Sequence, residues 1–495
     1  MTYDYVIIGS GLSGLCSGAL LAREGLRVLV CEKQPSPGGC CVSFRRRGYR
    51  FDVSVQSYSG CGPEGAVGSV LRRLGAEREI EFVRLDPARE YRFPDRTMLL
   101  PGSLEVYRDR LAETFPRERE GIARYLGLQK EIYDEIQRLP VEIPLSAAAR
   151  FERDFPRLTE HRRTTVAEVL ADCVTDPRLR TILAIRSSYF ALPPSRASFV
   201  AVSNMEMNYF LEGVYVARGG AQALTDVLVG ALARHGGELA LATEVRRIRT
   251  ENQAVVGVET AGGQAIAARH VIAAMTPRRV FDDLLEPPLP NDHPYRRRLE
   301  GLRTSASYFI AFWGVRTDDL GDSGIGNKEV FEDYDLEREY AALDRGEMDA
   351  RAPFFVLAPS IIDRGATPDG QGHTICASVK APYALRGGWD RERRRSLAER
   401  LFERARRCLP RLAPDDVDVT ETVAPTTIER RTGNLEGSPY GWAHTPGQVG
   451  LDRPGPVTPI AGLYLVGHWT RPGGGVASVF VSARSLVERL LARNG

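Results

Sequence analysis

The chain opens with an apolar run that stops at a glycine and continues into apolar positions at helical spacing. Positions 6–8 predict a buried strand, and 12–24 predict a helix that ends at Gly25, because glycine accepts the left-handed conformation common at helix ends. A second apolar strand at 28–31 leads into Glu32. This order of strand, helix and strand predicts a parallel α/β unit at the N-terminus.

Further along, strand-like and helical patterns alternate. Residues 44–52 predict a hairpin with an arginine–glycine tip, which we interpret as a solvated turn, with contact to anionic lipid head groups as the alternative. Ser103 begins a helical stretch, 104–139, that Pro116 interrupts, and 151–210 is largely helical. Later segments predict a helix at 221–232, strands at 239–242, 244–250, 255–260, 264–267, 269–274, 307–314, 354–357 and 374–379, and a charged helix at 390–408.

Three glycines join the first strand to the first helix with the spacing of a dinucleotide-binding turn. Gly9 permits the tight turn, Gly11 lets a pyrophosphate approach the backbone, and Gly14 lets the helix pack closely on the strand. The helix N-terminus offers free N–H groups and partial positive charge to the phosphates. Glu32 stands where a carboxylate accepts hydrogen bonds from ribose hydroxyls. The sequence therefore predicts a nucleotide cofactor and redox chemistry.

A second glycine loop stands near the C-terminus. A buried strand ends at Gly467, the glycines 473–475 follow, and a helix then begins with Val476 and Ala477. Two helix N-termini at opposite ends of the chain fit FAD better than NAD, because FAD is long enough for one to hold its pyrophosphate while the other reaches the flavin. N–H groups of this second loop would stabilise negative charge on reduced flavin.

The length of 495 residues is too great for one core of ordinary size, so two domains are expected. Because both glycine loops serve one cofactor, we assign residues 1–85, 215–285 and 445–495 to a discontinuous cofactor domain. Residues 86–214 and 286–444 then form an inserted substrate-binding domain.

Composition and charge narrow the function classes. The chain is 43% hydrophobic and 26% charged, as in soluble globular proteins, and a net charge of +2 gives no reason to expect a nucleic acid partner. We expect no signal peptide and no membrane span. The eight cysteines lack metal-ligand spacing, so we expect no metal site and a reducing, cytoplasmic environment. We interpret the adjacent Cys40 and Cys41 as small residues packed near the cofactor, with a redox disulfide as the alternative.

Several segments together resemble one family. They are GSGLSG with Glu32, PGGCCVSF with YRFDV, VARGGAQAL with ALARHGGEL, GVET with VIAA, and GLYLVGHWTRPGGGVASV. Along nearly its full length the chain resembles the phytoene desaturase, carotenoid isomerase and retinol saturase group of the flavin amine-oxidase superfamily. The resemblance implies an α/β fold, in which a Rossmann-like FAD-binding domain of the glutathione-reductase and amine-oxidase type carries an inserted α+β substrate domain. It implies FAD contacts from Gly9, Gly11, Ser13, Gly14, Glu32, Lys33, Gly39, Val245 (through its backbone, to adenine), Gly467, Gly474, Gly475, Val476 and Ala477.

The same resemblance implies hydride transfer between an extended apolar substrate and flavin N5. On a polyene the developing cation is delocalised, so positioning matters more than a strong base. Oxygen, a quinone or another acceptor would then reoxidise the flavin. The chain departs from the group's FDAGVH pattern after Asp52, where it lacks the glycine and the histidine, and it has His468 where amine oxidases tend to carry an acid.

Few side chains are candidates for acid, base or orienting roles. His468 lies at the flavin loop and titrates near neutrality, with a structural hydrogen bond to the loop as the alternative. Gln56 and Tyr58 follow the hairpin and either orient a polar substrate group or pack behind the site. We interpret Glu206 as part of a solvated helix face, with a base of raised pKa as the alternative.

Arginines and aromatic residues of the middle segment are candidates for substrate contacts. Arg186 and Arg218 either bind a substrate carboxylate or phosphate or, the favoured interpretation, form salt bridges. Either a cavity wall or plain core accounts for Tyr189, Phe190, Met205, Met207, Tyr209, Phe210, Tyr440, Trp442 and His444.

We therefore predict an FAD-dependent desaturase or dehydrogenase of a hydrophobic polyene or isoprenoid-like substrate. Open alternatives are a tailoring oxidase of a polyketide, amine or amino-acid-derived metabolite, a redox-neutral carotenoid isomerase, and a non-catalytic isoprenoid-binding escort protein. A hydrophobic substrate also predicts a cytoplasmic protein that contacts a membrane surface peripherally, through the inserted domain.

Overall fold

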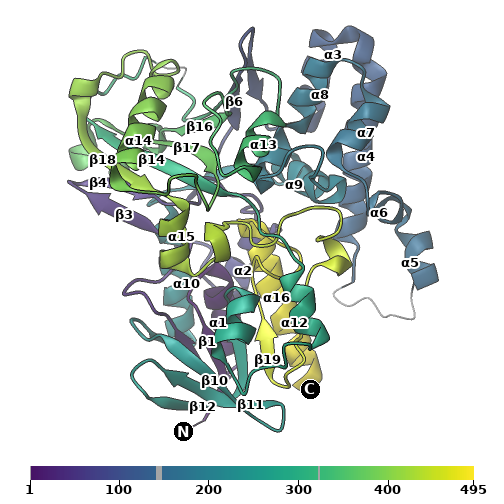
Figure 1. Cartoon of the computed structure of the whole chain (residues 1–495), viewed down its shortest axis with the longest axis vertical. Coiled ribbons are helices and arrows are strands. Elements are labelled where there is room, and N and C mark those ends of the chain that lie inside the picture. Colours follow the sequence, from purple (N-terminus) through teal and green to yellow (C-terminus); the bar gives the residue numbers. More distant parts are fainter. Residues whose placement is uncertain (1, 141–147, 322–323, 495) are drawn as a thin grey trace.

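The computed structural model describes residues 2–140, 148–321 and 324–494. The chain forms an eight-stranded and a seven-stranded sheet. Figure 1 shows the first at the end of the molecule that holds the N-terminus and the second at the opposite end. A group of helices lies beside the second sheet. Within the described ranges, no helix is long and apolar enough to cross a membrane.

The eight-stranded sheet contains the parallel unit predicted at the N-terminus. Its strands are β1 (Tyr3–Ile8), β2 (Val28–Cys31), β9 (Glu238–Ala240), β10 (Val245–Glu251), β11 (Ala254–Thr260), β12 (Ala265–Ala273), β13 (Leu285–Glu286) and β19 (Leu463–Leu465). Strands β12, β1, β2 and β9 are parallel neighbours in that order, and β19 also pairs parallel with β12. The strands predicted at 264–267 and 269–274 form one continuous strand, β12, which pairs first with β11 and then with β1.

Alternating side chains of β1 enter two different cores. Tyr5 and Ile7 pack with residues of α1 (Leu12–Arg23), α10 (Ala221–Arg234) and α16 (Val476–Asn494). Val6 and Ile8 pack on the opposite face with residues of β10, β11 and β12. Strand side chains alternate with a period of two, so a sheet covered on both faces requires the continuous apolar run of β1.

The two faces of the seven-stranded sheet belong to different hydrophobic clusters. Its strands, in spatial order, are β18 (Val417–Val423), β14 (Ser307–Val315), β17 (His373–Ala381), β16 (Phe354–Leu357), β15 (Asn327–Val330), β6 (Arg89–Arg92) and β7 (Thr97–Leu100). Phe309 and Trp313 of β14 pack beneath α14 (Arg391–Arg406), whereas Ile310 and Phe312 face the other way. The three strands and the charged helix predicted for this region are confirmed, and Asp390 caps the helix.

The predicted hairpin is present as β3 (Ser43–Arg46) and β4 (Tyr49–Asp52). Its tip is Arg47 and Gly48, whose φ angles are 49° and 88°. The rings of Phe44 and Phe51 lie 5.4 and 5.7 Å from the ring of Phe312. The hairpin, which we assigned to the cofactor domain, therefore packs on the seven-stranded sheet as well.

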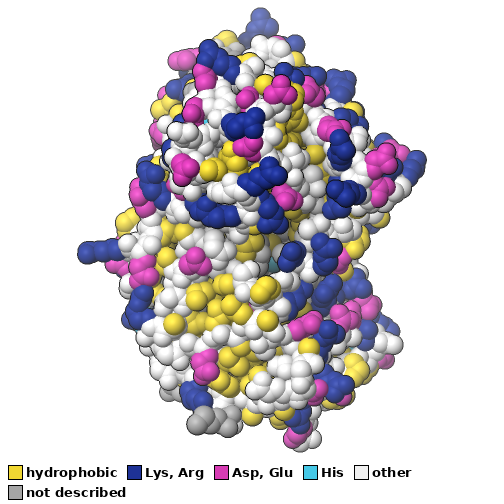
Figure 2. Space-filling model, turned by 90° about the vertical axis from the view of Figure 1, so that its left-hand side faces the viewer, with side chains coloured by type: hydrophobic (Ala, Val, Ile, Leu, Met, Phe, Trp, Pro, Cys, Tyr) yellow, Lys and Arg dark blue, Asp and Glu magenta, His cyan; other side chains and the backbone are white. Residues whose placement is uncertain are grey.

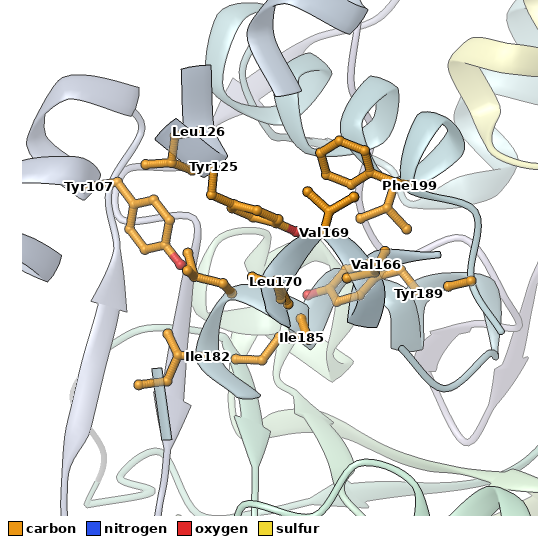
Figure 3. Packing of buried hydrophobic residues seen from close by; sticks show 14 of the residues in the cluster. Tyr107, Tyr125, Leu126, Val166, Val169, Leu170, Ile182, Ile185, Tyr189 and Phe199 are labelled. Atoms are coloured by element: carbon orange, nitrogen blue, oxygen red, sulfur yellow. The ribbon is translucent and has the colours of Figure 1, made fainter. Parts of the chain in front are cut away.

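The helical stretch predicted after Ser103 is confirmed, together with its interruption. Ser103 Oγ accepts a hydrogen bond from the N–H of Val106 at 3.3 Å, and a 3-10 turn at Pro116–Glu118 separates α3 (Leu104–Thr114) from α4 (Arg119–Gln137). Figure 3 shows aromatic and aliphatic side chains of this region interleaved in one core. The later helices are α5 (Ala148–Asp154), α6 (Pro156–His161), α7 (Val166–Cys173), α8 (Pro177–Ala184) and α9 (Phe199–Leu211).

Shorter elements complete the fold, and its surface carries mixed charge. These elements are α2 (Ala66–Arg73), β5 (Phe82–Arg84), β8 (Tyr215–Ala217), α11 (Pro277–Arg279), α12 (Pro294–Glu300), α13 (Arg338–Asp344) and α15 (Pro425–Thr432). On the face that Figure 2 turns to the viewer, basic and acidic side chains are interspersed, in keeping with the small net charge.

Candidate active site

The two glycine loops meet at one edge of the eight-stranded sheet. Ile8 at the end of β1 and Leu465 at the end of β19 both lie opposite Ala273 of the intervening strand β12. Gly9 follows Ile8, and Gly467 comes two residues after Leu465. Because the carboxyl ends of parallel strands are the usual ligand-binding edge, the N-terminal and C-terminal loops face the same site.

The first loop has the geometry that its glycines predict. Gly9 has a φ of 99°, and a Cβ on Gly14 would lie 2.1 Å from the carbonyl oxygen of Gly9, so only glycine lets α1 approach β1 this closely. A Cβ on Gly11, in contrast, would meet no protein atom within 4 Å. Gly11 caps α1 with no side-chain hydrogen bond, which leaves the helix N-terminus to a ligand.

Glu32 is held rigidly at the end of β2. One carboxylate oxygen, Oε2, accepts hydrogen bonds from the Ser10 backbone N–H at 2.9 Å and from Ser10 Oγ at 2.7 Å. The other, Oε1, accepts the N–H of Gln34 at 2.8 Å. A carboxylate has about four lone-pair sites, so acceptor capacity remains for ribose hydroxyls.

The C-terminal loop packs directly on the first loop. A Cβ on Gly467 would lie 2.6 Å from Ser13 Oγ, and the Gly467 N–H donates to Ser482 Oγ of α16 at 3.0 Å. The Gly474 N–H donates to His444 Nε2 at 3.2 Å, and a Cβ on Gly473 would lie 2.4 Å from the same nitrogen. Burial lowers the pKa of His444 well below its usual value, so this histidine accepts as a neutral ring.

A buried arginine that the sequence analysis missed organises this loop. The Arg453 guanidinium, 0% exposed, donates to the carbonyl oxygens of Tyr440, Trp442, Gln448, His468 and Thr470. Burial lowers its pKa to about 9. No local pattern around Arg453 could have indicated this role, because its acceptors lie up to 17 residues away and are all backbone groups.

A cavity of about 1090 Å³ runs along this edge and on toward the seven-stranded sheet. Most of the predicted cofactor residues line it, namely Gly9, Gly11, Ser13, Glu32, Lys33, Gly39, Val245, Gly474, Gly475, Val476 and Ala477. Gly14 and Gly467 lie behind the lining, where they permit the close packing of the two loops. The volume is at the upper end of ligand sites, which span about 300–1,000 Å³, so it suits a long cofactor together with a substrate.

Part of the cavity is bounded by an aromatic wall, which we define as Tyr189, Phe190, Tyr209, Tyr308, Phe355 and Tyr440. Met205 lines the same part, whereas Met207 and Phe210 belong to the helical core. Trp442 and His444 lie outside the lining, and Trp442 packs against Trp469 at 4.9 Å. The two interpretations of the aromatic candidates, cavity wall and core, therefore each hold for part of the set.

Residues 12–491 match the family of flavin containing amine oxidoreductases. The chain belongs to this family. It is 26% identical over 515 residues to a chloroplastic prolycopene isomerase of Daucus carota, covering 100% of this chain and 80% of that protein. It is also 26% identical over 516 residues to a neurosporene-forming phytoene desaturase of Cereibacter sphaeroides, covering 98% of this chain and 93% of that protein. Among solved structures, an oxidoreductase from Methanosarcina mazei shares the fold with a TM-score of 0.70 at 18% identity, over 98% of this chain and 99% of that one.

These matches confirm the resemblance to the carotenoid desaturase, isomerase and retinol saturase group, the Rossmann-like fold with a substrate domain, and FAD as the cofactor. The family member described here is an FAD-dependent oxidoreductase. The residues at the cavity edge suit FAD: Gly11 leaves open space above the helix N-terminus, and Glu32 offers acceptors.

The candidate residues for chemistry occupy different environments in the flavoenzyme. His468 lines the cavity, and burial lowers its pKa to about 3, so the ring is neutral at physiological pH. Gln56 lines the cavity, but its Nε2 donates to the carbonyl of Asp52 at 2.9 Å. Tyr58 lies in the core beside Phe82 and outside the cavity lining, which suits the packing alternative.

The prediction that Glu206 lies on a solvated helix face is wrong. Its side chain is buried in α9, 3.6 Å from the guanidinium of Arg186. Burial raises the pKa of Glu206, but the residue lies behind the cavity wall. Arg186 is also buried, 4.7 and 4.6 Å from the ring centroids of Tyr189 and Tyr209, and Arg218 forms an exposed salt bridge with Glu81 at 2.8 Å. Both arginines therefore have the salt-bridging role that we favoured.

The adjacent cysteines both line the cavity as free thiols. Cys41 Sγ donates to the carbonyl of Ala221 at 3.1 Å, and Cys40 Sγ accepts from Asn434 Nδ2 at 3.5 Å. These contacts fit the packing interpretation. Within the described ranges, no cluster of histidine, cysteine, aspartate and glutamate side chains could hold a metal ion.

Proposed function

We propose that this flavoenzyme is a desaturase or dehydrogenase that takes hydride from a long, hydrophobic polyene or isoprenoid-like substrate. One observation supports this most strongly: a single cavity is lined both by the dinucleotide-binding residues and by the aromatic wall. A substrate lying along that wall reaches the cofactor without crossing solvent. The two relatives named above, an isomerase and a desaturase of carotenoids, agree with an apolar substrate class.

FAD, when bound, supplies a hydride acceptor at flavin N5. The protein supplies position and environment. The rings of the aromatic wall hold an extended chain in place through apolar contact. A desaturation also releases a proton from the neighbouring carbon, and a weak acceptor such as water suffices because the delocalised cation is strongly acidic. The carboxylates in the cavity lining, Glu32, Glu244, Asp283 and Glu421, are not part of the aromatic wall, which agrees with a reaction that needs no strong base beside the substrate.

We assign His468 a hydrogen-bonding role toward the cofactor or the substrate. It remains neutral, since its pKa is far below the physiological range, and its buried Nε2 has no partner within the described part of the protein. Such a nitrogen costs free energy unless a ligand satisfies it. We propose Gln56 as an orienting residue with its carbonyl turned to the ligand, since its amide group is already engaged.

Two alternative functions would use the same cavity. A redox-neutral isomerase would use the same aromatic wall without net change in the flavin. A tailoring oxidase would need polar contacts, and Arg89, Asn204 and Asn208 in the lining are suited to them.

Anaerobic mixing with candidate substrates tests the proposal. A desaturase substrate is expected to bleach the visible absorption of the oxidised flavin in a single turnover, and product analysis would show one added double bond. Bleaching by amines, with no response to any polyene or isoprenoid, would refute the proposed function and establish the tailoring oxidase. Conversion of a cis polyene to its trans isomer only after prior reduction of the flavin would establish the isomerase.

A further inference from the structure

The cavity face of the seven-stranded sheet carries more buried charge than a hydrocarbon substrate requires. In the sheet register, Glu329 lies opposite both Tyr91 and Phe355, and Arg89 is two residues before Tyr91. Strand side chains two apart share a face, so Arg89 and Glu329 lie on the same face as Phe355 of the aromatic wall. Lys380 of β17 and Arg186, which precedes the wall residue Tyr189, add two further buried cations.

Two of these three cations have a carboxylate partner. Lys380 Nζ lies 2.9 Å from Glu339 Oε1, and Arg186 Nε lies 3.6 Å from Glu206 Oε2. These pairs balance charge within the protein and lie behind the cavity lining.

Arg89 differs from them. It is only 6% exposed and lines the cavity, yet its side chain forms no ion pair and no hydrogen bond with any residue of the described ranges. Its guanidinium carbon lies 5.3 and 5.2 Å from the ring centroids of Tyr189 and Phe355, and its Nη1 is buried without an acceptor. Glu329, which is 0% exposed, is the nearby carboxylate whose charge favours the charged form of Arg89, but the two side chains form no ion pair. Glu329 Oε1 accepts instead from Ser188 Oγ at 3.3 Å.

A buried cation without a bonded anion is costly unless a ligand completes it, because burial removes its hydration. The guanidinium lies beside two rings, and it offers a fork of N–H donors that matches a carboxylate. We propose that Arg89 anchors a carboxylate of the substrate, and therefore that the substrate is a long apolar acid rather than a pure hydrocarbon. This inference rests on the proposed function, since it concerns the substrate of the same cavity.

The structure supplies a matched set of variants for the test. Arg89→Met replaces the charge with an apolar side chain of similar length, and Arg89→Lys keeps the charge but removes the fork. Arg218→Met removes an arginine that is exposed and already paired with Glu81, and it serves as the control. Visible absorption of bound FAD shows that each holoenzyme variant is folded. If Arg89→Met does not retain FAD, the comparison is made with Arg89→Lys.

The probes are all-trans-retinoic acid, its methyl ester and geranylgeranyl diphosphate, titrated into each holoenzyme while flavin absorption and fluorescence are followed. The wild-type enzyme is expected to bind the acid at least about tenfold more tightly than the ester. Arg89→Met is expected to raise the Kd for the acid by about 10- to 100-fold, as for loss of a charged hydrogen-bonded pair, and to change the Kd for the ester by less than about threefold. The Kd of Arg89→Lys for the acid is expected to lie between those of the wild type and Arg89→Met, and Arg218→Met is expected to bind both probes as the wild type does.

Equal binding of acid and ester by the wild type, or an unchanged acid affinity in both Arg89 variants, would overturn the inference and leave the proposed function standing. If the diphosphate binds more tightly than the acid, and if this binding depends on Arg89, the assignment of a carboxylate is overturned. If neither the acid nor the ester binds, the proposed function falls together with the inference.

Discussion

Gly11→Ala separates cofactor binding from folding, because the added methyl group meets only the space reserved for the ligand. A Cβ at this position has no protein atom within 4 Å, and the backbone φ of −64° suits alanine. Alanine is a poorer helix cap than glycine by a few tenths of a kcal/mol to about 1 kcal/mol, and it lowers the entropy of the unfolded chain by about 0.4–1 kcal/mol. These terms nearly cancel, so the apoprotein should keep its stability within about 1 kcal/mol.

The cofactor should respond quite differently. A methyl group placed in a well-packed contact costs about 1–3 kcal/mol, which corresponds to about a 5- to 150-fold rise in the Kd for FAD. Fluorescence quenching during FAD titration of the apoprotein measures the Kd, and urea unfolding of the same sample measures stability.

Two further variants bracket this result. Gly14→Ala places a Cβ 2.1 Å from the Gly9 carbonyl oxygen, so the apoprotein itself should be destabilised by about 1–3 kcal/mol. Gly127→Ala in α4, away from the cavity and also without contacts within 4 Å, should stabilise slightly and leave FAD binding unchanged. If Gly11→Ala bound FAD as tightly as the wild type, the cofactor would not pass over Gly11 and the assignment of the first loop would be refuted.

Three further predictions concern the C-terminal loop and the surface. Because the pKa of His468 is lowered to about 3, the unfolded chain binds more protons than the folded one between about pH 3 and 6.5, and the free energy of unfolding should fall as the pH drops through that window. In urea unfolding, His468→Gln should remove about 2 kcal/mol of the loss between pH 7 and pH 5, and an identical pH dependence in both proteins would contradict this. Arg453→Met leaves five carbonyls without a donor and should lower FAD occupancy and the Tm together, whereas a full FAD complement at unchanged Tm would show that the loop does not depend on Arg453. Contact of the hairpin tip with anionic lipid head groups, the alternative interpretation of residues 44–52, predicts co-sedimentation with anionic liposomes that Arg47→Glu reduces; recovery of all protein in the supernatant at every lipid composition would count against it.

The nucleotide end of the site could be predicted because its signals are local. Gly9, Gly11 and Gly14 lie within six residues, and each reports a backbone conformation or a close approach that side chains forbid. Apolar runs such as β1 likewise report burial on both faces of a sheet without knowledge of the partners.

Short polar strands escaped prediction. β6 and β15 have four residues each and include charged side chains, so nothing in their composition separates them from surface loops. The burial of Glu206 could not be predicted either. An acid on a helix is usually exposed unless a partner such as Arg186 reaches it from another element.

The amino-acid sequence alone was enough to predict the parallel unit, the two glycine loops and the flavin that they serve, because glycine spacing and apolar periodicity act over a few residues. The residues that line the substrate part of the cavity come together through long-range packing. There, Arg89 of β6, Tyr189 beside α8, Phe355 of β16 and Tyr440 near the C-terminus converge from positions up to 351 residues apart. Whether a lone arginine is a solvated surface charge or a buried anchor depends on which rings and carboxylates the sheet register places beside it.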